Sequence, residues 1–151
     1  MTKSQRMKPV QRVAEAREQA TAKDLAAAQR YLKDQETRMA ELRQYQREYL
    51  QQSQDMGRAG ISAARYMEMQ RFLANVDKAI EQQRQVVDNA VRVCEQKRRI
   101  WQEAYSKCKS LDKVVERFAA QELYVASQRE QKELDEIAQQ RSRGEPTKGE
   151  S

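Results

Sequence analysis

The stretch "SQDMGRAGIS", residues 53 to 62, holds two of the four glycines in a chain of 151 residues. No glycine or proline occurs in residues 10 to 56 or 61 to 143, which predicts two long helices because these residues most often end helices. Gly57 and Gly60 can adopt left-handed conformations that end one helix and reverse the chain, and Ser62 can cap the next helix. The stretch therefore predicts the tip of a helical hairpin.

The composition favours helices that share only a narrow seam. The chain is 38% hydrophobic and 34% charged, which is too polar for a thick globular core. Alanine, glutamate, lysine, leucine, arginine and glutamine dominate, as in coiled coils. We therefore expect an all-α protein whose two long helices form an antiparallel coiled-coil hairpin.

Charge and hydropathy limit the possible partners and locations. The formal net charge is +6, but 29 basic residues are interleaved with 23 acidic ones. The best basic cluster, Lys97 to Arg99, is typical of a solvated helix face rather than of a nucleic-acid site. No run reaches the roughly 18 apolar residues of a membrane span, and "MTKSQRMKPVQRVAEAREQ" lacks the apolar centre of a signal peptide. The expected location is the cytoplasm.

The two cysteines fit that compartment. Cys94 and Cys108 would lie about 21 Å apart along one helix, too far for a disulfide within it. We interpret both as buried thiols in a reducing compartment rather than as redox or metal-binding groups.

A repeat of three and four residues runs through the second segment for about eight heptads, which indicates a supercoil with a partner helix. Its positions are Tyr66, Met69, Leu73, Val76, Ile80, Gln83, Val87, Ala90, Cys94, Lys97, Trp101, Ala104, Cys108, Leu111, Val115, Phe118, Glu122 and Val125. Gln83, Lys97 and Glu122 are the polar or charged interruptions.

The first segment repeats the pattern more weakly. Its positions are Leu25, Ala28, Leu32, Gln35, Met39, Leu42, Gln46 and Tyr49. Val10, Val13 and Ala20 fall outside that frame, which predicts a discontinuity near residues 17 to 24, where small side chains would let the helices approach closely.

A turn centred near residue 59 places Gln35 and Gln83 at the same level, as a polar layer that can fix the register. Pro9 suits a first helical turn. The segment "RGEPTKGES" carries the remaining breakers. The predicted boundaries are a single hairpin domain over residues 1–142, with a first helix at about 8–56, a turn at about 57–61, a longer second helix at about 62–142 and a disordered tail at 143–151.

Catalytic motifs are absent from the sequence. It has no histidine, no cysteine pair at metal-binding spacing, no glycine-rich phosphate loop and no nucleophile elbow. We therefore expect no enzyme, no cofactor and no metal site, and we look for the function in what the surface binds.

Three short motifs within residues 40 to 85 occur together in one order. They are "YQREY" near the end of the first helix, "DMGRAGI" at the turn and "RFLANVDKAIEQQ" early in the second helix. With them the chain resembles the FliJ family, the coiled-coil component of the bacterial flagellar type III export apparatus.

The resemblance implies an antiparallel coiled coil similar to the central stalk of rotary ATP synthases. It also implies four functional features: binding to the hexameric export ATPase, contact with the cytoplasmic linker of the export gate, recycling of substrate chaperones, and a peripheral place at the inner membrane of the flagellar base. The positions that match the family's gate-binding patch are Leu42, Tyr45, Tyr49, Phe72, Val76, Ala79 and Gln83. Of these, Tyr45 and Phe72 flank the seam, so we expect them to make the contacts.

Unequal helix lengths predict an overhang. The first helix would cover the second only back to about residue 110, which leaves residues 111 to 142, roughly 48 Å of helix, without a partner. Large exposed apolar stripes mark partner sites. The predicted ATPase-binding residues are Leu111, Val115, Phe118, Leu123, Tyr124 and Val125. Arg117 and Lys132 could meet acidic loops of the ring.

Two other functions remain open from the sequence. The exposed seam could pair with a second copy of the chain, which would make the protein a self-associating structural scaffold. A basic helical protein could also bind nucleic acid or an acidic membrane surface.

Overall fold

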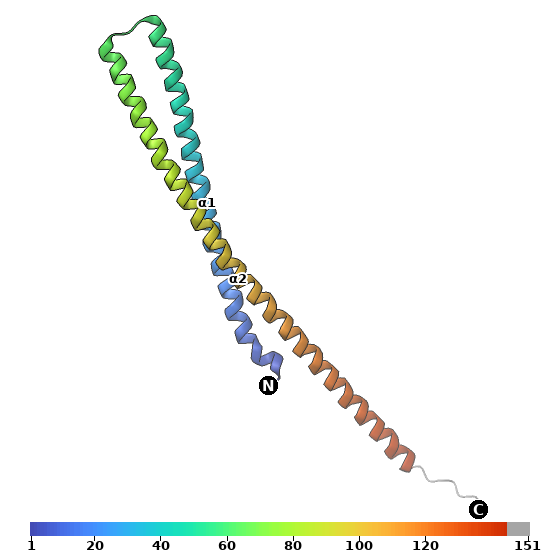
Figure 1. The fold of residues 1–151 in the computed structure, drawn as a ribbon. Helices are drawn as coiled ribbons and strands as arrows, with labels where there is room; N and C mark the ends of the chain where they lie inside the picture. Colours follow the sequence, from blue (N-terminus) through green and yellow to red (C-terminus); the bar gives the residue numbers. More distant parts are fainter. Residues whose placement is uncertain (145–151) are drawn as a thin grey trace, which may run out of the picture. The chain divides into compact units, whose positions relative to one another are not determined.

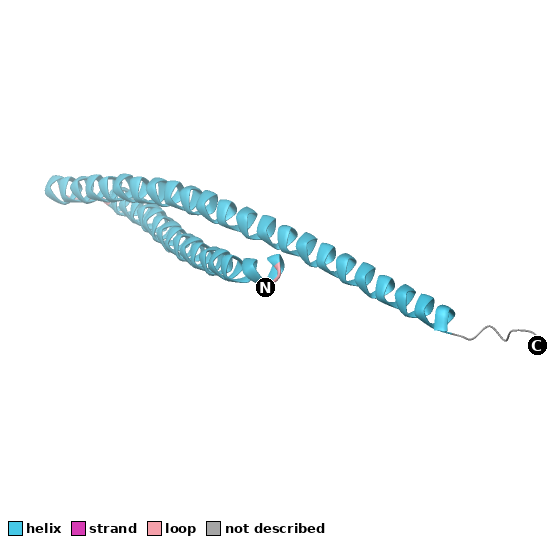
Figure 2. Cartoon of the chain, turned by 90° about the horizontal axis from the view of Figure 1, so that it is seen from below, coloured by secondary structure: helices cyan, strands magenta, loops and turns pink. Residues whose placement is uncertain are grey.

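The computed structural model describes residues 1–144, and residues 145–151 lie outside the described part. It contains helix α1 (Lys3–Ala59) and helix α2 (Ala63–Gly144). Figure 1 shows the chain reversing between them, and Figure 2 marks no strand in the described residues. The predicted all-α fold of two long helices packed against each other is confirmed. The sequence predicts a tail at residues 143–151. Its first two residues, Arg143 and Gly144, belong to α2, and the others lie outside the described residues.

Contacts along the chain define two units, which we describe separately. The turn unit comprises Glu18–Ala104, and the terminal unit comprises Met1–Arg17 with α2 from Tyr105 onward. Each unit contains one stretch of α1 and one stretch of α2. The single hairpin domain expected over residues 1–142 remains a prediction.

The turn between the helices is shorter than the sequence predicts. Gly60 has a positive φ of 88°, and its N–H donates to the Gly57 carbonyl at 3.3 Å. Ser62 caps α2, since its Oγ accepts from the Arg65 N–H at 3.3 Å. The expected left-handed role of Gly57 is wrong, because α1 continues to Ala59 and Gly60 alone supplies the left-handed conformation.

In the turn unit, the seam follows the predicted repeat on both helices. Met39 from α1 and Met69, Val76, Ala90 and Cys94 from α2 are buried apolar residues at repeat positions. The Gln35–Gln83 layer is also present, because the Gln83 amide donates to both the carbonyl and the side-chain oxygen of Gln35 at 2.9 Å. At the start of the predicted run, Tyr66 is 55% exposed and lies outside the seam.

The predicted discontinuity near residues 17 to 24 is wrong. Thr21 is buried and Glu18 half-buried in the turn unit, where Glu18 accepts a 3.0 Å hydrogen bond from the Trp101 indole N–H. Val10 and Val13 are 45% and 70% exposed. The repeat therefore continues through polar and small residues, and the apolar residues that seemed to interrupt it lie outside the seam.

In the terminal unit, the start of α1 pairs with α2 much further along than expected. The Gln11 amide donates to Asp112 at 3.0 Å, and the Ser4 N–H donates to Glu122 at 3.0 Å. The seam positions here are Ser4, Met7, Gln11 and Ala14 of α1 with Cys108, Leu111, Val115, Phe118 and Glu122 of α2. The predicted overhang from residue 111 is therefore wrong, because α1 begins at Lys3 and reaches Glu122.

The same early start corrects the expectation for Pro9. This proline lies inside α1 rather than in its first turn. Proline removes one helical hydrogen bond and its ring crowds the carbonyl four residues earlier. The Thr2–Gln5 hydrogen bonds at the start of α1 and the contacts of its first residues with α2 both support the helical form here.

Candidate binding surfaces

An aromatic cluster joins the two helices of the turn unit. Tyr45 and Tyr49 are four residues apart on α1, which places their side chains on one helix face. The Phe72 ring of α2 lies with its centroid 4.4 Å from that of Tyr49 and 5.9 Å from that of Tyr45, the latter edge-on. Tyr45 is 49% exposed, whereas Tyr49 and Phe72 are half-buried. The cluster therefore both packs the helices together and presents one aromatic side chain to solvent.

The other predicted gate-binding residues differ in accessibility. Val76 is only 7% exposed and belongs to the seam, while Leu42, Ala79 and Gln83 are half-buried. A groove of about 430 Å³ brings Leu42, Tyr45 and Gln83 together. The geometry thus separates Val76, a packing residue, from members of the predicted set that a partner could reach.

Two charged residues that the sequence reasoning missed line the same groove. Arg38 and Glu41 of α1 lie beside Leu42 and Tyr45. Their positions, seven and four residues before Tyr45, could have indicated them, since residues three, four and seven apart share a helix face. The groove therefore has an aromatic wall and a charged rim.

A second groove of about 390 Å³ lies between the helices next to the turn. It is lined by Tyr49, Gln52, Ser53, Met56, Arg65, Glu68, Met69 and Phe72. The Ser53 Oγ in this groove is buried without a hydrogen-bond partner. The aromatic cluster therefore continues toward the turn into a recess with both polar and apolar lining, which the sequence pattern did not single out.

The predicted ATPase-binding residues fall into two groups in the terminal unit. Leu123, Tyr124 and Val125 are 73%, 66% and 47% exposed. Leu111, Val115 and Phe118 are half-buried seam residues. The structure therefore presents only the later half of the predicted set to a partner. The two basic residues expected to meet the ring, Arg117 and Lys132, are both exposed.

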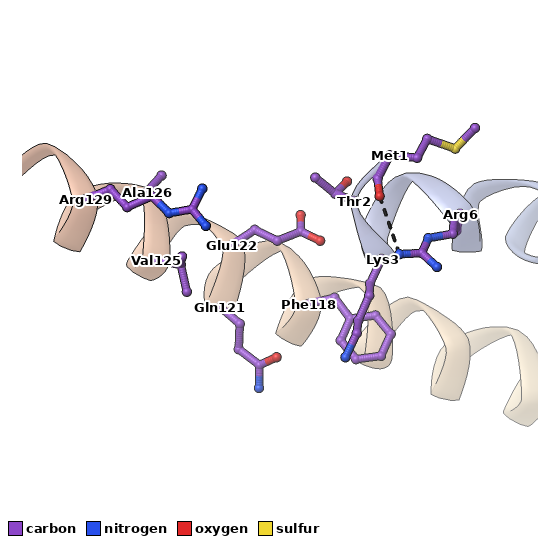
Figure 3. A pocket seen from close by; sticks show the side chains of 10 residues that line it. All are labelled: Met1, Thr2, Lys3, Arg6, Phe118, Gln121, Glu122, Val125, Ala126 and Arg129. Carbon is purple, nitrogen blue, oxygen red and sulfur yellow. Dashed lines mark hydrogen bonds between the residues drawn. The ribbon is translucent and has the colours of Figure 1, made fainter.

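A groove of about 470 Å³ lies where the start of α1 meets α2 (Figure 3). Its lining residues are Met1, Thr2, Lys3, Arg6, Phe118, Gln121, Glu122, Val125, Ala126 and Arg129. The Lys3 Nζ lies 5.6 Å from the centre of the Phe118 ring, a cation–π contact. Hydrogen bonds from the Ser4 side chain and backbone lower the pKa of Glu122. These hydrogen bonds therefore favour the ionised form of the Glu122 carboxylate.

Other features bear on alternative chemistry. Among residues 1–144, no group of three histidine, cysteine, aspartate or glutamate side chains is placed to hold a metal ion. Over the same residues, neither helix has a stretch that is apolar and long enough to cross a membrane. Cys94 and Cys108 are both buried, one in each unit.

Comparison with known proteins identifies the family. The profile of the flagellar FliJ protein family matches residues 2–147 of the chain. No curated protein and no solved structure matched. The match covers nearly the whole chain and confirms the resemblance carried by the motifs around the turn. The chain therefore belongs to the FliJ family of flagellar proteins and is a component of the flagellar export apparatus.

Proposed function

We propose that this protein is a non-catalytic adaptor of the flagellar export apparatus. It binds the hexameric export ATPase as a central stalk, contacts the cytoplasmic linker of the export gate, and recycles substrate chaperones. It works in the cytoplasm at the inner membrane of the flagellar base. Its two binding surfaces lie in different units, the gate surface in the turn unit and the ATPase surface in the terminal unit.

The observation that carries the gate contact is the half-exposed Tyr45 beside Phe72. Aromatic side chains that are partly packed and partly accessible are typical anchors of protein interfaces. Phe72 fixes the Tyr45 ring from the second helix, so little side-chain freedom is lost on binding. Leu42 and Gln83 supply the adjacent floor of the groove.

The gate contact can be tested with two double variants, each of which removes two aromatic side chains. Tyr45→Ala with Phe72→Ala should weaken binding to the purified cytoplasmic part of the gate at least about tenfold, because the anchor is lost. Tyr31→Ala with Tyr66→Ala removes two exposed aromatics of the same unit, 52% and 55% exposed, and should leave binding unchanged. Circular dichroism must show similar helix content in all proteins. If the first variant unfolds, or if both variants bind alike, the cluster is packing and the gate assignment is wrong.

The ATPase contact is best tested on the exposed residues. Truncation after residue 110 would also strip α1 of its partners Asp112 and Glu122, so it cannot isolate the binding role. Leu123→Ser with Tyr124→Ser and Val125→Ser keeps those partners and should lower ATPase stimulation, measured as phosphate release by the purified ATPase. Leu134→Ser with Ile137→Ser is the matched control, since both are exposed apolar residues of α2. Unchanged stimulation by the triple variant would refute this surface.

A self-associating scaffold is the alternative function. It is supported by Leu123, Leu134 and Ile137, which are 73%, 56% and 48% exposed on α2. Their spacing of eleven and three residues places them on one helix face. Sedimentation of the purified chain alone and with the ATPase distinguishes the two proposals: a scaffold forms dimers or larger species alone, whereas an adaptor stays monomeric and sediments with the ring.

A further inference from the structure

The start of α1 is capped twice, by its own Thr2 and Gln5 and by a carboxylate from the other helix. Thr2 Oγ1 accepts from the Gln5 N–H at 3.3 Å, and the Gln5 side-chain oxygen accepts from the Thr2 N–H at 3.2 Å. The first four N–H groups of a helix lack partners within it, and an acidic residue there is favoured by the helix dipole. The first turn of α1 contains no acidic residue. Glu122 of α2 takes this place: its Oε1 accepts from the Ser4 N–H at 3.0 Å and its Oε2 accepts from the Ser4 hydroxyl at 2.6 Å. Glu122, which interrupts the apolar repeat of α2, thus serves as a cap for the start of α1.

The segment that Glu122 caps has its own cap from Thr2 and Gln5, but it carries unfavourable charge and is followed by a proline. Residues 3–8 carry the cations Lys3, Arg6 and Lys8, which are unfavourable near the positive end of a helix. Pro9 follows directly, so the hydrogen bond that would join it to Gln5 is missing. Residues 3–8 therefore have one helical hydrogen bond fewer to the rest of α1, and Pro9 is the point at which they would separate from it most easily.

This segment lies over apolar residues of α2. Lys3 stands over the Phe118 ring, and the side chains of both line the groove shown in Figure 3. Phe118 and its seam neighbours Val115 and Leu111 are half-buried, while Val125, the next seam position after Glu122, is 47% exposed. The face of α2 is thus covered up to Glu122 and open beyond it. A partner that used the whole face would have to displace the start of α1.

We propose that residues 3–8 of α1 act as a latch: Glu122 helps to hold them over Phe118, and their release at Pro9 uncovers an apolar face of α2 that continues to the exposed Val125. The uncovered face binds the export ATPase ring. This proposal rests on the proposed function. It divides the predicted ATPase surface into an open half, Leu123 to Val125, and a covered half, Leu111, Val115 and Phe118. The latch restrains ATPase binding until the start of α1 is displaced, either by the ring itself or by loss of the hydrogen bonds between Glu122 and Ser4.

The latch itself can be tested on the isolated chain. Val115→Cys places a thiol in the covered seam, and Cys94 and Cys108 are buried internal references. Adding Glu122→Ala should raise the labelling rate at position 115 by about tenfold, because the segment opens more often. Glu116→Ala is the matched control: it removes one exposed carboxylate from the same helix and should change the rate less than about twofold. Equal rates in the two variants would overturn the latch, and faster labelling of Cys94 would show global loosening and overturn it too.

A closed form provides the opposite test. Ser4→Cys with Glu122→Cys allows a reversible disulfide at the point where these side chains meet. The oxidised protein should bind the purified export ATPase at least about tenfold more weakly than the same protein after reduction, since the covered half of the face stays hidden. Equal affinity of the two redox forms would overturn the masking role.

These measurements separate failure of the latch from failure of the proposed function. If the wild-type chain binds the ATPase and both redox forms bind it equally, the function stands and the latch fails. If no form binds the ATPase, the proposed function fails, and the masking role fails with it. Stronger ATPase binding by Glu122→Ala, together with faster labelling at position 115, supports the latch.

Discussion

The turn unit and the terminal unit use the same seven-residue repeat to different effect. Of the eight buried apolar residues in the described part of the chain, six lie in the turn unit, among them Met39, Met69 and Val76, and two, Ala14 and Cys108, lie in the terminal unit. Both units also have hydrogen-bonded pairs across the helices, such as Gln35–Gln83 in the turn unit and Ser4–Glu122 in the terminal unit. A shared repeat therefore fixes which residues face the partner helix, while the identity of those residues decides how firmly the helices hold together.

The largest expected effect tests this difference directly with two equal truncations. Met39 of the turn unit is 9% exposed, and Met7 of the terminal unit is half-buried. Met39→Ala should lower the free energy of unfolding by about 2 kcal/mol, because it removes buried apolar surface. Met7→Ala should cost less than about half of that, since less surface is lost. Urea unfolding followed by circular dichroism measures both, and equal losses would show that the two seams are equally firm.

The polar layer of the turn unit should have the next largest effect. Gln83→Leu leaves the Gln35 side chain and carbonyl without their donor and should cost about 1 to 2 kcal/mol. Gln35→Leu with Gln83→Leu should recover that loss, at the expense of a less specific register. Spin labels at residues 38 and 80, expected to be close within one chain, would show the register as a single short distance. A single sharp distance in the double variant would mean that the glutamine pair does not set the register.

A smaller effect is expected from pH at the start of α1. Hydrogen bonds from Ser4 lower the pKa of Glu122, so its contribution is present above the ordinary carboxyl pKa and is lost as pH falls through the lowered value. Lys3, Arg6 and Arg129 line the same groove. The Ser4 amide signal in NMR should titrate with a midpoint below that of an exposed glutamate. Glu122→Gln should abolish this titration, and a persistent titration in that variant would assign it to another group.

The smallest effect is expected at the exposed ion pairs of the turn unit. Arg84 contacts Glu81 at 2.6 Å and Asp88 at 3.0 Å, and all three side chains are about half exposed. The hydrogen bond from Arg84 lowers the pKa of Glu81, but solvent and salt screen such pairs. Arg84→Ala should shift Tm by less than about 2 °C. A larger shift would mean that the surface of α2, as well as its seam, stabilises the turn unit.

The apolar repeat predicted the seam of α2 from Met69 to Phe118, because apolar residues there recur at helical spacing. It failed for the start of α1, where Ser4, Gln11, Glu18 and Thr21 occupy seam positions. A search for apolar side chains cannot find such positions, since their polar groups are satisfied only by partners distant in the sequence, as Glu18 is by Trp101. The error in the predicted overhang has the same origin.

The candidate binding surfaces, like the seam, were predicted from the sequence only in part. The motifs around the turn singled out Tyr45 and Phe72, and the structure places their rings in contact. The repeat also separated Val76, a seam position that is buried, from Ala79, which lies beside the seam and is half-buried. Arg38 and Glu41 were missed although their helical spacing from Tyr45 could have indicated them, because an apolar pattern does not select charged residues.

The sequence by itself determined that the chain forms two long helices joined at residues 53 to 62. Absent breakers, helical spacing and a glycine turn are local properties, and local backbone preferences suffice to fix them. Only the tertiary structure decided that the carboxylate of Glu122 caps α1, that Pro9 lies inside a helix and that half of the predicted ATPase surface is covered. These outcomes depend on how far one helix extends along the other, which is set by contacts between residues more than a hundred positions apart in the chain.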